Sequence, residues 1–166
     1  MVPDYPVKGV NFWDMNSLFA GPAFKDTIDC LVKNCQYVKS PTHIVGIESR
    51  GFAIGGAVAY AMDLPFVMLR KSGSKYPGEL LTQSYDLEYG EDTLVLQSGL
   101  LGHCDRVIIL DDLIATGGSM DAAEKLVIKT GAKYLCGVTV VNLRSLRRRK
   151  DQVVYSCLLY TSPSPR

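Results

Sequence analysis

The chain has 166 residues, 47% of them hydrophobic, which suits one compact domain that buries roughly 70% of its unfolded surface. Eighteen basic and seventeen acidic residues leave a formal net charge of +1, which excludes a strong general attraction to nucleic acid or to an anionic membrane. No apolar run reaches the roughly 18 residues of a membrane span, and the first residues lack the pattern of a signal peptide.

The cysteines indicate a reducing compartment. They are odd in number, scattered, and form no C-x-x-C pair, which argues against a disulfide framework or a zinc site. We therefore expect a cytoplasmic protein. The five are Cys30, Cys35, Cys104, Cys136 and Cys157.

The first half of the chain has the pattern of a βαβ unit. An amphipathic helix is predicted from residue 21 to about residue 38, and a short buried strand at 43–47. A polar turn at 48–51 leads into an Ala/Gly-rich helix at 52–62, and a second buried strand follows at 65–70.

The middle of the chain is less regular. Residues 71–83 show no periodicity and are rich in Ser, Gly, Lys, Tyr and Pro, which predicts a long loop of the kind that often forms a lid. Residues 84–96 carry strand signals around a turn at 89–92, which predicts a hairpin.

A second βαβ unit follows, with strands at 106–110 and 134–141 and a helix at 119–129. Near-continuous apolar strands that alternate with helices indicate an α/β fold: one doubly wound domain with a mostly parallel sheet and helices on both faces. In such sheets the ligand binds beyond the carboxyl ends of the strands.

Two segments near the end carry no predicted function. The basic run 147–150 is interpreted as a solvated turn or helix end. We assign residues 1–155 to the domain, and expect 156–166, which end in a Ser/Pro-rich stretch, to be disordered or foreign to it.

The most informative stretch is 107–119, where an apolar strand meets two carboxylates and then a turn of small residues that opens a helix. The first amides of a helix lack partners and carry partial positive charge, so this turn favours an anion such as a phosphate monoester. Hydroxyls at Thr116 and Ser119 can add donors. The predicted phosphate ligands are Ala115, Thr116, Gly117, Gly118 and Ser119.

The acid pair Asp111–Asp112 precedes this turn directly. Two carboxylates beside a phosphate site can accept hydrogen bonds from the 2- and 3-hydroxyls of a ribose 5-phosphate. The alternative interpretation is a solvated turn. Other phosphate-binding patterns, G-x-x-x-x-G-K-[ST] and G-x-G-x-x-G after a strand, are absent.

Residues 107–119 closely resemble the phosphoribosyl pyrophosphate motif of the type I phosphoribosyltransferases. Further segments resemble, in order, those of the adenine-specific members of that family, and the resemblance reaches from the start to about residue 145. These segments are DYP at 4–6, GVNFWD at 9–14, GIESRGF at 46–52, LRK at 69–71, KYPG at 75–78 and SYDLEYG at 84–90.

The resemblance implies roles for cationic and polar residues around the leaving pyrophosphate, with Arg50 in the turn after a strand also assisting catalysis. It implies that Arg70 reaches toward the neighbouring subunit of a homodimer. Mg²⁺ is expected on the pyrophosphate substrate, with no ligand directly from the protein. The implied pyrophosphate ligands are Ser49, Arg50, Arg70, Lys71 and Lys75.

The resemblance also implies a small base-binding hood at about residues 1–20. In it, Phe12 stacks on adenine and the backbone around Asn11 and Trp13 reads the edge of the base. Glu88, with Tyr89 beside it, is implied to exchange a proton with the purine as N9 becomes the nucleophile.

The resemblance thus implies an enzyme with a flexible catalytic loop that makes AMP and pyrophosphate from adenine and phosphoribosyl pyrophosphate. No nucleic-acid or membrane partner is expected. Two alternatives stay open. One is a phosphoribosyltransferase for hypoxanthine, guanine or xanthine, and the other is a non-catalytic regulator of the same fold that binds phosphoribosyl pyrophosphate or a nucleotide. Retention of Arg50, Lys71 and Glu88 favours the enzyme.

Overall fold

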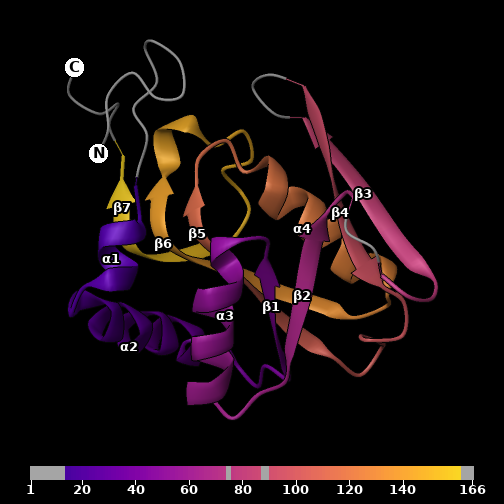
Figure 1. The fold of residues 1–166 in the computed structure, drawn as a ribbon, viewed down its shortest axis with the longest axis horizontal. Helices are drawn as coiled ribbons and strands as arrows, with labels where there is room; N and C mark the ends of the chain where they lie inside the picture. Colours follow the sequence, from indigo (N-terminus) through magenta and orange to yellow (C-terminus); the bar gives the residue numbers. More distant parts are fainter. Residues whose placement is uncertain (1–13, 74–75, 87–89, 162–166) are drawn as a thin grey trace.

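The computed structural model describes residues 14–73, 76–86 and 90–161, which form a seven-stranded sheet in the order β3-β4-β2-β1-β5-β6-β7 with helices on both faces (Figure 1). The strands are β1 (His43–Ile47), β2 (Phe66–Lys71), β3 (Leu80–Asp86), β4 (Glu91–Gln97), β5 (Arg106–Ile114), β6 (Lys133–Leu143) and β7 (Val154–Tyr160). The helices are α1 (Asn16–Ala20), α2 (Ala23–Gln36), α3 (Arg50–Ala61) and α4 (Gly118–Lys129), with a 3-10 turn at Arg144–Leu146.

The centre of the sheet is parallel and buried on both faces. β1 pairs in parallel with β2 and β5, and β6 pairs in parallel with β5 and β7. Side chains alternate between the two faces of a strand, so Val45 packs in one core cluster and its neighbour Ile44 in the other. This is why the central strands are continuous apolar runs, and the predicted parallel α/β fold is confirmed.

The two faces are covered by different helices. Helices α2 and α3 pack on one face, where α2 buries Ile28, Leu31 and Cys35. Helix α4 packs on the opposite face and also contacts the β3–β4 hairpin. Figure 1 shows this division, with α2 and α3 on one side of the sheet and α4 on the other. Within the described residues, no helix has the length and apolar character needed to cross a bilayer.

The predicted hairpin is present, but it starts earlier than its sequence pattern indicated. β2 extends to Lys71 and β3 begins at Leu80, so the prediction of a loop throughout 71–83 is wrong for residue 71 and for residues 80–83. β3 is an edge strand in which Leu81, Gln83 and Tyr85 are partly buried while their neighbours Thr82 and Ser84 are exposed. Such a half-buried strand has little apolar signal, which explains the error.

The predicted end of β5 is also wrong. The strand continues past Leu110 through both acids to Ile114, because Asp111 pairs with Thr139 and Leu113 with Val141 of β6. The acid pair is therefore part of the sheet rather than of the loop that follows it.

The end of the chain differs most from prediction. Residues 156–160 belong to β7 and pair in parallel with β6, so the prediction that 156–166 is a disordered or foreign tail is wrong for this part. The apolar run of β7 is adjacent in sequence to Ser and Pro residues, which masked its strand pattern. Arg147, expected to be solvated, is only 6% exposed.

We expect neighbouring glycines of α3 to respond oppositely to alanine. A Cβ at Gly55 would lie 2.6 Å from Cε2 of Phe66, whereas one at Gly56 would meet nothing within 4 Å. Gly55→Ala should lower the free energy of unfolding by about 1–3 kcal/mol through overpacking. Gly56→Ala should raise it by roughly 0.5–1 kcal/mol, because glycine is unfavourable inside a helix. Urea denaturation of the two variants measures this, and equal effects would contradict the close packing of α3 on the sheet.

Candidate active site

A cavity of about 310 Å³ lies where β1 and β5 end. Because these two strands are parallel neighbours, the segments that follow them leave the sheet at the same edge. The cavity is lined by the turn after β1, the ends of β2 and β3, the end of β5, and the loop into α4. The lining residues are 47–50, Lys71, Tyr85, Asp86, 111–113 and 115–119.

The loop into α4 has the geometry of an anion site. Gly117 has φ 90°, ψ 6°, a left-handed conformation that suits glycine, and it is the N-cap of α4. Helix α4 then begins at Gly118, and the amide of Asp121 donates to the carbonyl of Gly117 at 2.9 Å. The amides ahead of Asp121 have no acceptor inside the helix, so they are suited to bind a phosphate.

The acid pair lines the same cavity. Asp112 is 5% exposed, and its Oδ2 lies 2.8 Å from Nε of Arg50 in an ion pair. Burial and the neighbouring charge of Asp112 raise the pKa of Asp111 well above its usual value. The positive charge of Arg50 lowers this pKa, but only enough to offset part of the rise. The solvated-turn interpretation does not fit two acids that belong to β5, where Asp112 is buried and Asp111 is partly buried.

Helix α3 starts at Arg50, two residues before its predicted start, directly after a cis peptide bond between Glu48 and Ser49. Glu48 Oε2 accepts a hydrogen bond from the backbone N–H of Lys71 at 2.7 Å, which joins the ends of β1 and β2. Ser49 and Arg50 of this turn line the same cavity as the loop residues Ala115–Ser119.

The two cations at the end of β2 lie in different surroundings. Lys71 lines the cavity, and its Nζ is 3.6 Å from Asp92 Oδ2. Arg70, the preceding residue, points to the other face of the strand, where its guanidinium lies 4.8 Å from the centre of the Tyr76 ring. The structure therefore brings Lys71, but not Arg70, to the cavity of its own chain.

Six predicted site residues lie outside the described residues: Asn11, Phe12, Trp13, Lys75, Glu88 and Tyr89. Their proposed roles therefore stay predictions.

Three polar side chains that line the cavity were not predicted as site residues, one from the turn after β1 and two from β3. Glu48 closes the turn after β1, and Tyr85 and Asp86 end β3. Tyr85 donates to Asp92 Oδ2 at 3.2 Å, and burial, followed by the charge of Asp92, raises its pKa. Glu48 lies in the GIESRGF segment, and Tyr85 and Asp86 lie in the SYDLEYG segment. The resemblance of these two segments to the family could therefore have pointed to all three residues.

Comparisons with known proteins agree with this geometry. Residues 14–163 match the family model of the phosphoribosyl transferase domain. That match covers most of the chain and includes every described residue of the cavity. The chain belongs to the phosphoribosyl transferase family.

Adenine phosphoribosyltransferases are among its relatives. The enzyme of that name from Haemophilus ducreyi is 43% identical over 155 residues, which cover 92% of this chain and 86% of the relative. The crystal structure of the enzyme from Thermoanaerobacter pseudethanolicus has a TM-score of 0.89 at 34% identity and covers 96% of this chain and 94% of its own.

The Saccharomyces cerevisiae enzyme, solved with an imino-altritol bisphosphate and adenine, has a TM-score of 0.83 at 35% identity and covers 93% and 91% of the two chains. Within the family, this chain therefore belongs with the adenine phosphoribosyltransferases, which are pentosyltransferases.

We predict that Asp111→Asn stabilises the unliganded protein at neutral pH while lowering its activity. Because the folded-state pKa of Asp111 is raised, the folded state binds a proton more tightly than the unfolded state. The wild type should then lose stability as the pH rises from the unfolded-state pKa of about 3.9 through the raised folded-state pKa. The variant has no carboxyl at this position, so its stability should not fall in this way.

The measurement is the urea midpoint of both proteins between pH 3 and pH 8. Asp112→Asn is the matched comparison and should not stabilise, because it breaks the ion pair with Arg50. Identical pH profiles for wild type and Asp111→Asn would show that the Asp111 carboxyl is not destabilised by its surroundings.

Proposed function

We propose that this chain transfers ribose 5-phosphate from phosphoribosyl pyrophosphate to N9 of adenine, giving AMP and pyrophosphate in purine salvage. The observation that carries the proposal is the single cavity that joins the acid pair, the loop into α4 and the turn at Ser49–Arg50. A sugar phosphate, its leaving group and its ribose hydroxyls need three such groups of residues side by side.

The 5-phosphate is assigned to the backbone amides of Ala115, Thr116, Gly117, Gly118 and Ser119. The hydroxyls of Thr116 and Ser119 add donors, so the phosphate receives both main-chain and side-chain hydrogen bonds. These donors are fixed before the substrate arrives, because the start of α4 holds the loop.

Asp111 and Asp112 are assigned to the ribose hydroxyls. The Asp112 carboxylate is held by Arg50, which fixes its position at the cavity wall. Binding a hydroxyl donor to Asp111 relieves part of the cost of its burial, because a hydrogen bond to the carboxylate favours its charged form.

Pyrophosphate is assigned to Ser49, Arg50 and Lys71, with Arg70 and Lys75 as further cations. Charge builds on the leaving group as the bond to C1 of the ribose breaks, and nearby cations stabilise it at that moment. Because Arg70 lies away from the cavity of its own chain, it is assigned to the neighbouring subunit of a homodimer.

Adenine is assigned to the hood at residues 1–20, with Phe12 against its face and the backbone near Asn11 and Trp13 at its edge. Glu88 exchanges the proton of the purine ring, and Tyr89 lies next to it in sequence. The reaction centre resembles an oxocarbenium ion, so water must be kept from it.

Mg²⁺ is assigned to the diphosphate and ribose oxygens of the substrate, where it neutralises phosphate charge. Across residues 14–73, 76–86 and 90–161, no group of three His, Cys, Asp or Glu side chains is placed to hold a metal. The carboxylates of Asp111 and Asp112 place negative charge beside the ribose, which fits a divalent cation that the substrate carries, without either acid being its direct ligand.

A cytoplasmic location is proposed as well, because all five cysteines are free thiols, as expected in a reducing compartment.

The direct test compares pyrophosphate release with adenine, hypoxanthine, guanine, xanthine and orotate, each with phosphoribosyl pyrophosphate and Mg²⁺. We expect release with adenine, and none after EDTA removes the divalent cation. Turnover of hypoxanthine but not adenine would move the base assignment to another purine. Binding of phosphoribosyl pyrophosphate without turnover of any base would favour the alternative of a non-catalytic regulator of the same fold.

We predict that Glu88→Gln lowers kcat by roughly 10² to 10⁴, because the amide cannot accept the purine proton. Glu91→Gln is the matched control, since Glu91 is three residues further along the sequence and is exposed at the start of β4, and it should retain nearly full activity. An unchanged kcat for Glu88→Gln would refute the proton transfer.

A further inference from the structure

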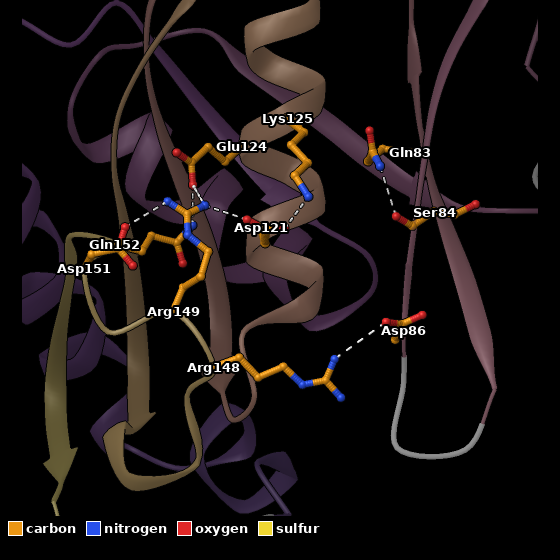
Figure 2. Close-up of polar contacts among 10 residues, drawn as sticks. All are labelled: Gln83, Ser84, Asp86, Asp121, Glu124, Lys125, Arg148, Arg149, Asp151 and Gln152. Carbon is orange, nitrogen blue, oxygen red and sulfur yellow. Dashed lines mark hydrogen bonds and ion pairs between the residues drawn. The ribbon is translucent and has the colours of Figure 1, made fainter.

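The segment that follows β6 is held firmly against α4. Arg147 is buried, and its Nη2 donates to the carbonyl of Gln152 at 2.8 Å, which closes the segment on itself. Arg149 Nη1 lies 2.5 Å from Asp121 Oδ1 and 3.0 Å from Glu124 Oε2, both on the first two turns of α4. Figure 2 shows Arg149 between these two acids and Asp151.

The contacts on α4 fix this segment beside the phosphate loop, Ala115–Ser119. Gln152 Nε2 donates to Glu124 Oε2 at 2.6 Å, and Lys125 Nζ lies 2.7 Å from Asp121 Oδ2. Burial opposes the charge of Asp121, but hydrogen bonds from Lys125 and Arg149 lower its pKa overall, so it stays ionised at neutral pH. The segment is thus anchored where α4 begins.

Arg148, the residue between these anchors, contacts both parts of the site. Its backbone N–H donates to the carbonyl of Thr116 in the phosphate loop at 2.9 Å. Its Nη1 lies 3.7 Å from Oδ2 of Asp86, which is the last residue of β3 (Figure 2). One residue therefore joins the phosphate loop to the end of the hairpin strand.

The loop and the hairpin also lie close together directly. A Cβ added at Gly118 would be 3.0 Å from the carbonyl oxygen of Asp86 and 3.3 Å from Cδ2 of Tyr85. A second cavity, of about 280 Å³, lies between them, and Arg148 and Arg149 line it. A shift of the phosphate loop would therefore affect the position of Asp86 in two ways, through the packing at Gly118 and through the ion pair with Arg148.

We propose that Arg148 is a positioning residue that couples the occupied phosphate loop to the end of β3 at Asp86. A bound 5-phosphate fixes Thr116, Thr116 fixes the backbone of Arg148, and the guanidinium then holds Asp86. This rests on the proposed function, because the loop must bind the 5-phosphate. The side chains of Arg148 and Asp86 are 59% and 79% exposed, so the coupling is modest, about two- to fivefold in affinity.

The test is calorimetric binding of ribose 5-phosphate to Arg148→Gln, Asp86→Asn and the double variant. Simple charge effects predict opposite results for the two single variants, since losing a cation weakens anion binding and losing an anion strengthens it. Coupling predicts that both weaken binding two- to fivefold and that the double variant is no weaker than either. Arg148→Lys, which keeps the charge, should bind nearly as tightly as wild type.

Lys150→Gln is the matched control, because it removes an exposed cation two residues away, and it should change the affinity less than twofold. The proposal is overturned if Asp86→Asn binds as tightly as wild type or more tightly, if the two losses add, or if Lys150→Gln equals Arg148→Gln.

The assay needs no turnover, so it separates this proposal from the proposed function. A wild type that binds ribose 5-phosphate with this pattern but makes no AMP would sustain the coupling and refute the activity. A wild type that does not bind ribose 5-phosphate would overturn the coupling together with the phosphate loop.

Discussion

The site depends on the junction between β5 and α4, where a buried strand passes through left-handed Gly117 into the start of a helix. The strand holds two carboxylates in the sheet, and the helix start presents amides that lack partners. Donors and acceptors for one sugar phosphate are therefore fixed within a few residues of each other. The other parts of the cavity are placed relative to this junction by the parallel pairing of β1 with β5.

The junction has a cost in stability that ligand binding offsets. Burial and the neighbouring Asp112 raise the pKa of Asp111, so they disfavour its ionised form. In exposed positions both acids would ionise without this cost. Arg50 compensates one carboxylate directly, and the other has the ribose as its proposed partner. The charged site thus lowers the stability of the unliganded protein below what its apolar core alone would give. Such a loss of stability is common at binding sites.

The sequence alone indicated the features that local pattern determines. Continuous apolar runs predicted β1 and β5, and small residues after two acids predicted the loop into α4. The edge strand β3 was misjudged because it is half-buried and carries polar residues, and β7 because its apolar run is adjacent in sequence to Ser and Pro residues. Contacts between distant segments, such as Arg148 with Asp86 or Glu48 with Lys71, could not be predicted, since no local pattern specifies which surface side chains the fold brings together.

A crystal structure of the protein with AMP bound would show whether the junction between β5 and α4 holds the sugar phosphate. We expect the phosphate within hydrogen-bond distance of the amides of residues 115–119, and the ribose hydroxyls at Asp111 and Asp112. An AMP phosphate that bound elsewhere, with the start of α4 left without an anion, would contradict it.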